Sequence, residues 1–257
     1  MSSRIHPTAI IHPSAMLEEV EVGAYAYIGP RVWIGKGTVI REHAYIQGWT
    51  RIGENNQIYP FVVIGTPPQV AHFKGEESWV EIGSRNIIRE FVTIHRAYGK
   101  GEKTRVGDEC YFMAYSHVAH NCKVGNGVIM ANCASLGGHV EVGDYAVIGG
   151  LVGVHQFCRI GKFVMIGACS KVVMDVCPYI RADGHPLKTY GLNTIGMKRR
   201  GISPETIKVL KEVYRIIFRS SLSLKESLEE VEKRWKGQEE VEEIIEFIKG
   251  SKRGIHR

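Results

Sequence analysis

The sequence predicts a mainly β protein: a parallel β-helix whose coils form a triangular prism, followed by a small α-helical domain. An aliphatic residue recurs at every sixth position over most of the chain up to Val172, and glycine often follows it. Beyond about residue 204, apolar residues take helical spacing instead. With 257 residues, 44% of them apolar, the chain can fill one large core and a second small one.

The six-residue rhythm defines the expected coils. A small or β-branched residue, such as Ala26 or Thr38, lies two positions before each aliphatic one. We expect both to point inward, and three six-residue sides to close a coil of about 18 residues, with coils stacked about 4.8 Å apart. The aliphatic positions are Ile10, Met16, Val22, Ile28, Ile34, Ile40, Ile46, Ile52, Ile58 and Ile64, then Ile82, Ile88 and Ile94, then every sixth residue from Val106 to Val172.

Two interruptions, at 66–81 and about 96–103, preserve the phase of the repeat. Both begin at the same point of a coil, so we expect two loops that leave one edge of the prism. The β-helix is expected over 1–178. An exit segment and a helical domain follow over 179–257, with 178–193 predicted to be irregular.

Helices are predicted at roughly 204–219, 223–236 and 239–249. Ser203-Pro204-Glu205 supplies an N-cap, a proline at the first helical position and an acid in the first turn. Ile207, Leu210, Tyr214 and Ile217 recur at helical spacing. We expect this domain to pack on one end of the solenoid and cover its core.

The net charge of +6 arises from Lys and Arg interleaved with Asp and Glu, which indicates ordinary solubility and no nucleic-acid partner. The compact basic run, Lys198-Arg199-Arg200, is either a solvated helix approach or a phosphate-binding clasp. No stretch has the length of a membrane span, so we expect a cytoplasmic protein without stable membrane insertion. Cys110, Cys122 and Cys158 occupy inward positions of the repeat, which predicts buried thiols.

Four histidines fall on one predicted edge: His95, His120, His139 and His155. His117 lies just before the same corner. A single histidine there would be an ordinary surface residue, but four at stacking distance, beside two loops, predict an active-site cleft. Stacked coils would spread the side chains, and no carboxylate lies beside them in the sequence. This favours acid–base catalysis over a metal site, so we expect neither metal nor cofactor.

Several motifs, taken in order, resemble the UDP-N-acetylglucosamine O-acyltransferase family over the whole chain. They are the IHPTAI start, VTIHR at Val92–Arg96, HVAHNCKVGN at His117–Asn126, GGLVGVHQFCRIG at Gly149–Gly161, and GMKRRG. The resemblance implies a left-handed β-helix and a homotrimer with sites between subunits. The implied reaction begins lipid A synthesis: a (3R)-3-hydroxyacyl chain passes from acyl carrier protein to the 3-position of UDP-N-acetylglucosamine.

The resemblance also implies roles for individual residues. His120 would be the general base, and the N–H of Gly138, in a glycine pair that is otherwise a tight corner, would stabilise the oxyanion. Ala168 stands where some members have Gly, so its methyl group would change the accepted acyl chain. Residues implied to bind the substrate are Gln69, His95, His117, His139, His155, Gln156, Asn193, Arg199 and Arg200.

Some positions depart from the family pattern. Asn121 follows the predicted base where Asp is frequent, and Val70 and His72 replace an acid and a lysine in the first loop. A 3-amino analogue of the sugar nucleotide therefore remains an alternative acceptor. Two further alternatives stay open: a histidine-bound zinc hydratase of the γ-carbonic anhydrase type on the same fold, and a non-catalytic solenoid.

Overall fold

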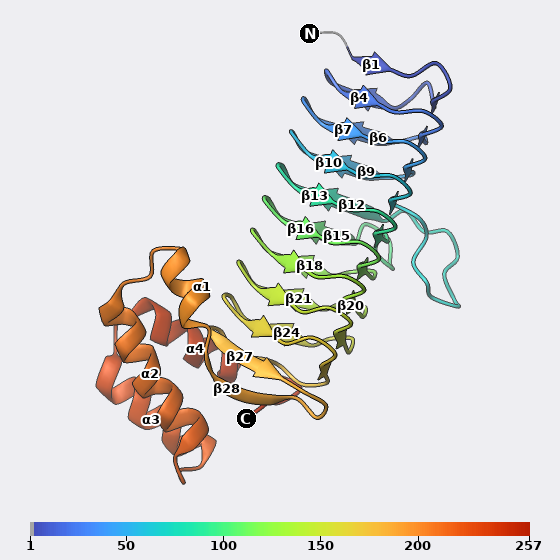
Figure 1. Cartoon of the computed structure of the whole chain (residues 1–257). Helices are drawn as coiled ribbons and strands as arrows, with labels where there is room; N and C mark the ends of the chain where they lie inside the picture. Colours follow the sequence, from blue (N-terminus) through green and yellow to red (C-terminus); the bar gives the residue numbers. More distant parts are fainter. Residues whose placement is uncertain (1–2) are drawn as a thin grey trace.

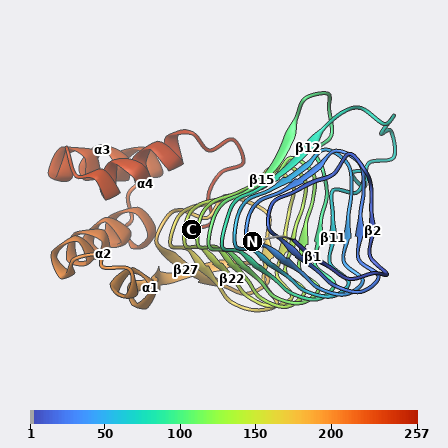
Figure 2. The same ribbon diagram turned by 90° about the horizontal axis from the view of Figure 1, so that it is seen from above.

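In the computed structural model, which describes residues 3–257, short strands stack into a solenoid with helices beside its C-terminal end (Figure 1). Each coil passes through three parallel sheets, here named A, B and C, and the view along the stack shows their closed outline (Figure 2). The predicted fold class, a left-handed parallel β-helix with a C-terminal helical domain, is confirmed.

Sheets A and B share an edge, the A–B edge. Sheet A contains β1 (Arg4–Ile5), β4 (Glu21–Val22), β7 (Val39–Ile40), β10 (Gln57–Ile58), β13 (Ile87–Ile88), β16 (Tyr111–Phe112), β19 (Ile129–Met130), β22 (Val147–Ile148), β25 (Met165–Ile166), β27 (Ile180–Asp183) and β28 (Lys188–Leu192). Sheet B contains β2 (Ile10–Ile11), β5 (Tyr27–Ile28), β8 (Tyr45–Ile46), β11 (Val63–Ile64), β14 (Thr93–Ile94), β17 (His117–Val118), β20 (Ser135–Leu136), β23 (Gly153–Val154) and β26 (Lys171–Val172).

Sheet C meets sheet B at the B–C edge and sheet A at the C–A edge. It contains β3 (Met16–Leu17), β6 (Val32–Ile34), β9 (Thr50–Ile52), β12 (Trp79–Ile82), β15 (Lys103–Val106), β18 (Lys123–Val124), β21 (Glu141–Val142) and β24 (Arg159–Ile160). The aliphatic position of the repeat and the small residue two before it are buried along the prism, as Ala134 and Leu136 illustrate at 0% exposure. The inward pairing read from the sequence is therefore confirmed.

The repeat slips by one residue in the first coil. Ile10 and Met16 were predicted to point inward, but they are 63% and 60% exposed. Ile11 pairs with Ile28 and Leu17 with Ile34, so these residues hold the inward register. Both sites carry two adjacent apolar residues, and a shift by one residue exchanges the faces of a strand. The periodicity alone did not separate the two registers.

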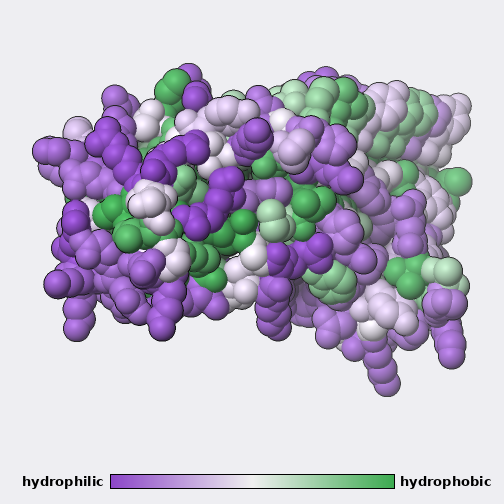
Figure 3. Space-filling model, turned by 90° about the horizontal axis from the view of Figure 1, so that it is seen from below, coloured by the Kyte–Doolittle hydropathy of each residue, from purple (hydrophilic) through white to green (hydrophobic). Residues whose placement is uncertain are grey.

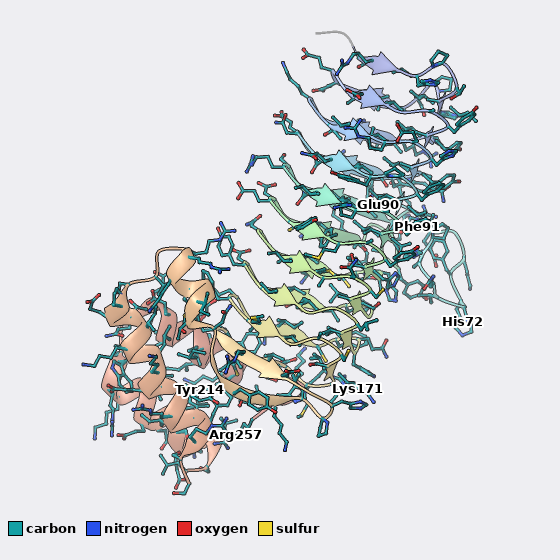
Figure 4. All side chains as sticks on the ribbon, viewed as in Figure 1. His72, Glu90, Phe91, Lys171, Tyr214 and Arg257 are labelled. Atoms are coloured by element: carbon teal, nitrogen blue, oxygen red, sulfur yellow. The ribbon has the colours of Figure 1, made fainter. Side chains whose placement is uncertain are left out.

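Both loops leave the B–C edge, as predicted. The first occupies 65–78, between β11 and β12, and the second occupies 95–102, between β14 and β15. The side-chain view places His72 near the tip of the first loop, away from the coils (Figure 4). Residues 79–81, which we assigned to the first loop, instead lengthen β12, because that strand pairs with both β9 and β15.

The exit segment is ordered, which corrects the prediction of irregular structure over 178–193. β27 pairs in parallel with β25 and in antiparallel with β28. The alternation of buried Ile180 and Ala182 with exposed Arg181 and Asp183 is the signal that we missed. A short helix that the sequence did not predict, α1 (Thr194–Arg199), follows. The position of the domain boundary, placed at residue 178, stays a prediction.

The remaining helices are α2 (Pro204–Arg219), α3 (Leu224–Trp235) and α4 (Glu239–Lys249). Ser203 caps α2 as predicted, accepting from the Thr206 N–H. Glu243 of α4 joins the domain to the coils, because its carboxylate lies 2.7 Å from both the Lys162 Nζ and the Tyr179 hydroxyl. Residues near the C-terminus cover the last coil, where the Asp175 N–H donates to the Gly254 carbonyl at 2.9 Å.

Cys110, Cys122 and Cys158 are buried free thiols, as predicted. Burial raises the pKa of Cys110 and Cys158 to about 11 and that of Cys122 to about 12. These thiols therefore stay protonated and act as small apolar side chains that fill the prism.

Candidate active site

The B–C edge carries the predicted histidine column. His120, His139 and His155 follow β17, β20 and β23, while His95 follows β14, at the root of the second loop. His117 is the outward residue of β17, one position before the buried Val118. The placement of all five side chains around one edge of the prism follows from the coil register, as the spacing in the sequence predicted.

His95 and His117 form the half of the column next to the loops. Their rings meet edge to face with centroids 5.3 Å apart. The His95 Nδ1 lies 2.8 Å from the Pro67 carbonyl oxygen, which can only accept, so Nδ1 donates. The Nε2 of the same ring is therefore an acceptor, and it is buried without a hydrogen-bond partner in the part of the chain that is described. A donor on a ligand would satisfy it.

Burial keeps this half of the column neutral. It lowers the pKa of His95, and it lowers the pKa of His117 to about 4, with smaller effects from the charges of His95 and His120. The Thr93 hydroxyl lies 2.7 Å from the His117 Nδ1 and fixes the ring. Both imidazoles are consequently hydrogen-bonding groups without charge at neutral pH.

His120 lies at the centre of the column. Its ring faces His139 edge-on at 5.3 Å and Tyr98 of the second loop at 6.3 Å. The ring also lies directly beside Gly138, where a β-carbon would meet Nε2 at 2.6 Å. The Gly138 carbonyl accepts from the Phe157 N–H at 3.0 Å, and among residues 3–257 we find no acceptor for the Gly138 N–H. A nitrogen that could take a proton and a free amide donor thus lie next to each other.

The other half of the column faces away from the loops. His139 adopts a left-handed backbone conformation, with φ of 61°, and stacks on Phe157 with centroids 4.6 Å apart. Burial, followed by the charge of His120, lowers its pKa. His155 and Gln156 are exposed, and the His155 Nδ1 lies 3.0 Å from the Gln156 carbonyl oxygen. Sequence reasoning missed Phe157, although it lies 18 residues after His139 and so at the same corner position.

The first loop is anchored beside the column. The Arg96 N–H donates to the Thr66 carbonyl at 3.1 Å, and the Arg96 guanidinium stacks on Trp49 and Phe73 at 4.6 and 5.1 Å from the ring centroids. Gln69 is exposed in this loop. The loop therefore borders the histidine column, with Gln69 available to a ligand.

Asn193, Arg199 and Arg200 lie elsewhere on the protomer. Asn193 caps α1, because its Oδ1 accepts from the Gly196 N–H at 3.0 Å, and its Nδ2 donates to the Phe163 carbonyl at 3.0 Å. The Arg200 guanidinium stacks on Tyr145 at the C–A edge, 4.5 Å from the ring centroid. Arg199 lines a cavity of about 480 Å³ against the outer face of sheet A, together with Ile129, Val147 and Met165.

Ala168 is exposed at the A–B edge, on the opposite side of sheet B from the histidines. Within one protomer, the predicted site residues therefore lie on different edges of the prism. The fold gathers the histidines, Gly138 and Gln156 at the B–C edge, with Gln69 in the adjoining loop. It leaves the nucleotide-binding candidates beside sheet A and the C–A edge.

Among residues 3–257, no three or more His, Cys, Asp and Glu side chains form a group that could hold a metal ion. Within the same residues, no helix is both long and apolar enough to cross a membrane.

Family models match two parts of the chain. A model described as bacterial transferase hexapeptide repeats matches residues 31–66 and 103–138, and one described as UDP-N-acetylglucosamine O-acyltransferase, domain 2, matches residues 175–256. Two similar relatives come from Thermodesulfovibrio yellowstonii and Syntrophobacter fumaroxidans. They are 52% and 48% identical over 99% of this chain and 100% of their own length. Both are named acyl-[acyl-carrier-protein]–UDP-N-acetylglucosamine O-acyltransferase.

Solved structures show the same similarity. The UDP-N-acetylglucosamine acyltransferase of Bacteroides fragilis is 42% identical, with a TM-score of 0.95 over 98% of this chain and 100% of its own. The Moraxella catarrhalis UDP-N-acetylglucosamine O-acyltransferase is 43% identical, with a TM-score of 0.93 over 98% and 99% of the two chains. The similarity covers both the prism and the helical domain.

Proposed function

Since the chain belongs to the UDP-N-acetylglucosamine O-acyltransferase family, and so is an acyltransferase of lipid A synthesis, we propose that it moves a (3R)-3-hydroxyacyl chain from acyl carrier protein to the 3-position of UDP-N-acetylglucosamine. This membership confirms the resemblance found in the sequence. The observation that carries the proposed chemistry is the juxtaposition of the His120 ring with Gly138. A carrier-protein thioester as donor places the reaction in the cytoplasm, as part of the same proposal.

In the proposed mechanism, His120 is the general base. Its Nε2 takes the proton from the sugar 3-hydroxyl as that oxygen attacks the thioester carbonyl carbon. The N–H of Gly138 donates to the carbonyl oxygen as negative charge develops there. When the C–S bond breaks, the protonated imidazole returns its proton to the departing thiolate of the carrier arm. No cofactor or metal takes part in these steps.

The neutral histidines and the first loop bind the acceptor in this proposal. The unpartnered His95 Nε2 accepts a hydrogen bond from a sugar hydroxyl, and His117 and His139 contact the same ring. Gln69 reaches the sugar from the loop, while His155 and Gln156 line the part of the cleft beyond His139. Asn193, Arg199 and Arg200 contact the nucleotide, where guanidinium groups suit the diphosphate.

This assignment requires more than one protomer, and we propose a homotrimer. The A–B edge carries an exposed ladder of stacked rings, Tyr25, His43, Phe61, Phe91 and Tyr115, with centroids 4.8–5.2 Å apart along the stack. Exposed Cys133 and then Leu151, 64% exposed, occupy the same corner in the next two coils. The view from below shows hydrophobic residues toward the C-terminal end of the stack (Figure 3). Along the A–B edge, stacked side chains run down the prism in Figure 4, where Phe91 is labelled. Exposed apolar surface of this extent favours self-association.

Three chains that meet at their A–B edges, around an axis parallel to the stack, would lay sheet B of one protomer against sheet A of the next. The B–C edge of the first would then approach the C–A edge of its neighbour. That packing would bring the histidine column to Arg199 and Arg200 of the adjacent protomer. It would also enclose the acyl chain between the outer faces of two sheets, with Ala168 near its far end.

The test is direct acylation. The purified protein is incubated with UDP-N-acetylglucosamine and a panel of 3-hydroxyacyl carrier proteins, and the sugar nucleotide is analysed by mass spectrometry. We expect one acyl group on the sugar 3-oxygen and no loss of activity with a chelator. Acylation of a 3-amino analogue alone would change the acceptor but keep the chemistry, whereas no product with either acceptor would refute the proposal.

A further inference from the structure

Asn121 holds together parts of the site that come from different segments of the chain. It lies at the corner directly after His120, in the left-handed backbone region with φ of 59°, and is 8% exposed. Its backbone N–H donates to the Thr104 hydroxyl at 2.9 Å. Its side-chain amide contacts both the His120 ring and the backbone of Tyr98 in the second loop.

The contacts with Tyr98 define how the Asn121 amide is oriented. The Tyr98 N–H can only donate, and it reaches the Asn121 Oδ1 at 2.8 Å. The Tyr98 carbonyl can only accept, and it lies 3.1 Å from the Asn121 Nδ2. The oxygen of the amide is therefore the atom that the His120 Nδ1 meets, at 2.8 Å. Because that oxygen has no proton, Nδ1 of the histidine must donate.

We propose that Asn121 is a positioning residue that keeps His120 as the tautomer protonated on Nδ1, with Nε2 free beside Gly138, and that it joins this ring to the loop 95–102. The proposal rests on the proposed function, in which Nε2 is the base. The same amide holds the loop and the His120 ring. The loop therefore adopts its folded position and Nε2 becomes free to accept a proton together. Displacing Tyr98 would release the amide and with it the tautomer.

The loop also explains why an amide suits this position. A carboxylate could accept from the His120 Nδ1 and the Tyr98 N–H, but its second oxygen would face the Tyr98 carbonyl oxygen without a proton between them. The repulsion would loosen the loop while the negative charge stabilised the protonated ring. The titratable groups that face the ring are Tyr98, His117 and His139, and none of them is a carboxylate. The charge of Glu102, at the end of the same loop, acts on His139. Asn121 therefore orders the loop without holding the base in its acid form.

Two variants test this inference. Asn121→Ala removes every side-chain bond, so we expect kcat to fall about 10- to 100-fold with a smaller change in KM. The ¹⁵N shifts of the His120 ring should change from the Nδ1-protonated pattern toward the other tautomer, with His120→Ala used to assign the signals. Asn121→Asp keeps the shape but not the donor. Trypsin should then cleave faster after Lys100 in the loop, and the acid limb of the pH–rate profile should move to higher pH.

Asn55→Ala is the matched control, because Asn55 is also a left-handed corner residue, with φ of 55°, but is exposed on the C–A edge. It should leave kcat, the histidine tautomer and the cleavage rate unchanged. An unchanged tautomer and kcat in Asn121→Ala, or unchanged cleavage and pH profile in Asn121→Asp, would overturn the inference. The NMR and proteolysis readouts need no substrate, so they test the Asn121 link even if the acylation assay refutes the proposed function.

Discussion

A β-carbon on Gly138 would lie 2.5 Å from Cε1 of His120, so only glycine leaves enough space for the ring in its observed position. The backbone of Gly138 has no positive φ, and alanine would be tolerated there but for the imidazole. Gly138→Ala should therefore push the ring aside and lower kcat by about 100-fold, with the melting temperature changed little. Steady-state kinetics and a thermal melt check this. Wild-type turnover in the variant would show that the ring position is not needed.

Removal of the proposed base should abolish most of the turnover. We expect His120→Ala to lower kcat by about 10²- to 10⁴-fold, because general-base assistance contributes an effect of this size. His12→Ala is the control, since His12 is exposed on the first coil and its side chain, among residues 3–257, bonds only to Ser14. Single-turnover acylation rates of the two variants and the wild type measure this effect. If His120→Ala retained more than about a tenth of the wild-type rate, His120 would be excluded as the base.

The stability of the protein should fall as the pH drops below about 6.5. The pKa of His117 is about 4 in the folded chain and 6.5 in its ordinary state, so the unfolded chain binds a proton that the folded chain refuses. Its contribution is fully present above about pH 6.5. Between about pH 7.5 and pH 5, the free energy of unfolding should drop by about 2 kcal/mol through this group.

Denaturant titrations at the two pH values, at equal protein concentration, measure that drop. His117→Gln should lose less stability over the same interval, because glutamine does not titrate. His12→Gln, on the first coil, should show the full wild-type loss. Equal losses in all three proteins would mean that His117 is not buried as the structure describes.

Oligomerisation should depend on the aromatic ladder. Phe91 is 42% exposed and stacks between Phe61 and Tyr115. Light scattering should show that Phe91→Glu converts the proposed trimer into protomers. Activity should fall by at least about 10-fold, because in the proposed trimer each site is divided between chains. Leu222→Glu, at a residue 38% exposed between α2 and α3, should keep the trimer. A trimeric and active Phe91→Glu protein would place the symmetry axis elsewhere.

Chain-length selection should respond to Ala168. In the proposed trimer its methyl group limits the acyl groove, so Ala168→Met should shift the preferred donor to a shorter chain and Ala168→Gly to a longer one. A change of about 10- to 200-fold in relative kcat/KM is the size expected for such a pocket. Competition between carrier proteins of different chain length measures it. Ala24→Met, at the equivalent corner of an early coil, should leave the preference unchanged.

Much of the prism could be predicted, because in a β-helix each residue's face follows from its place in the six-residue repeat. That placement alone predicted that His95, His120, His139 and His155 lie on one edge. The prediction was wrong at Ile10 and Met16, where two adjacent apolar residues fit either register equally well. It was wrong again over 178–193, where β27 pairs with β25 at the end of sheet A and β28 pairs with β27.

The sequence by itself determined the fold class, the edge that carries the histidines and the family, since these depend on spacing and local motifs. Only the tertiary structure decided the direction of the hydrogen bonds at His120 and which faces carry the remaining site residues. In the sequence Asn121 stood out only as a departure from the family's frequent Asp. In the fold the backbone of Tyr98, 23 residues away, orients its amide and with it the histidine proton. Asn193 and Arg200, which the motifs grouped with the histidines, proved to lie on another side of the protomer. Hydrogen-bond direction and the division of a site between faces depend on segments that meet only when the chain is folded.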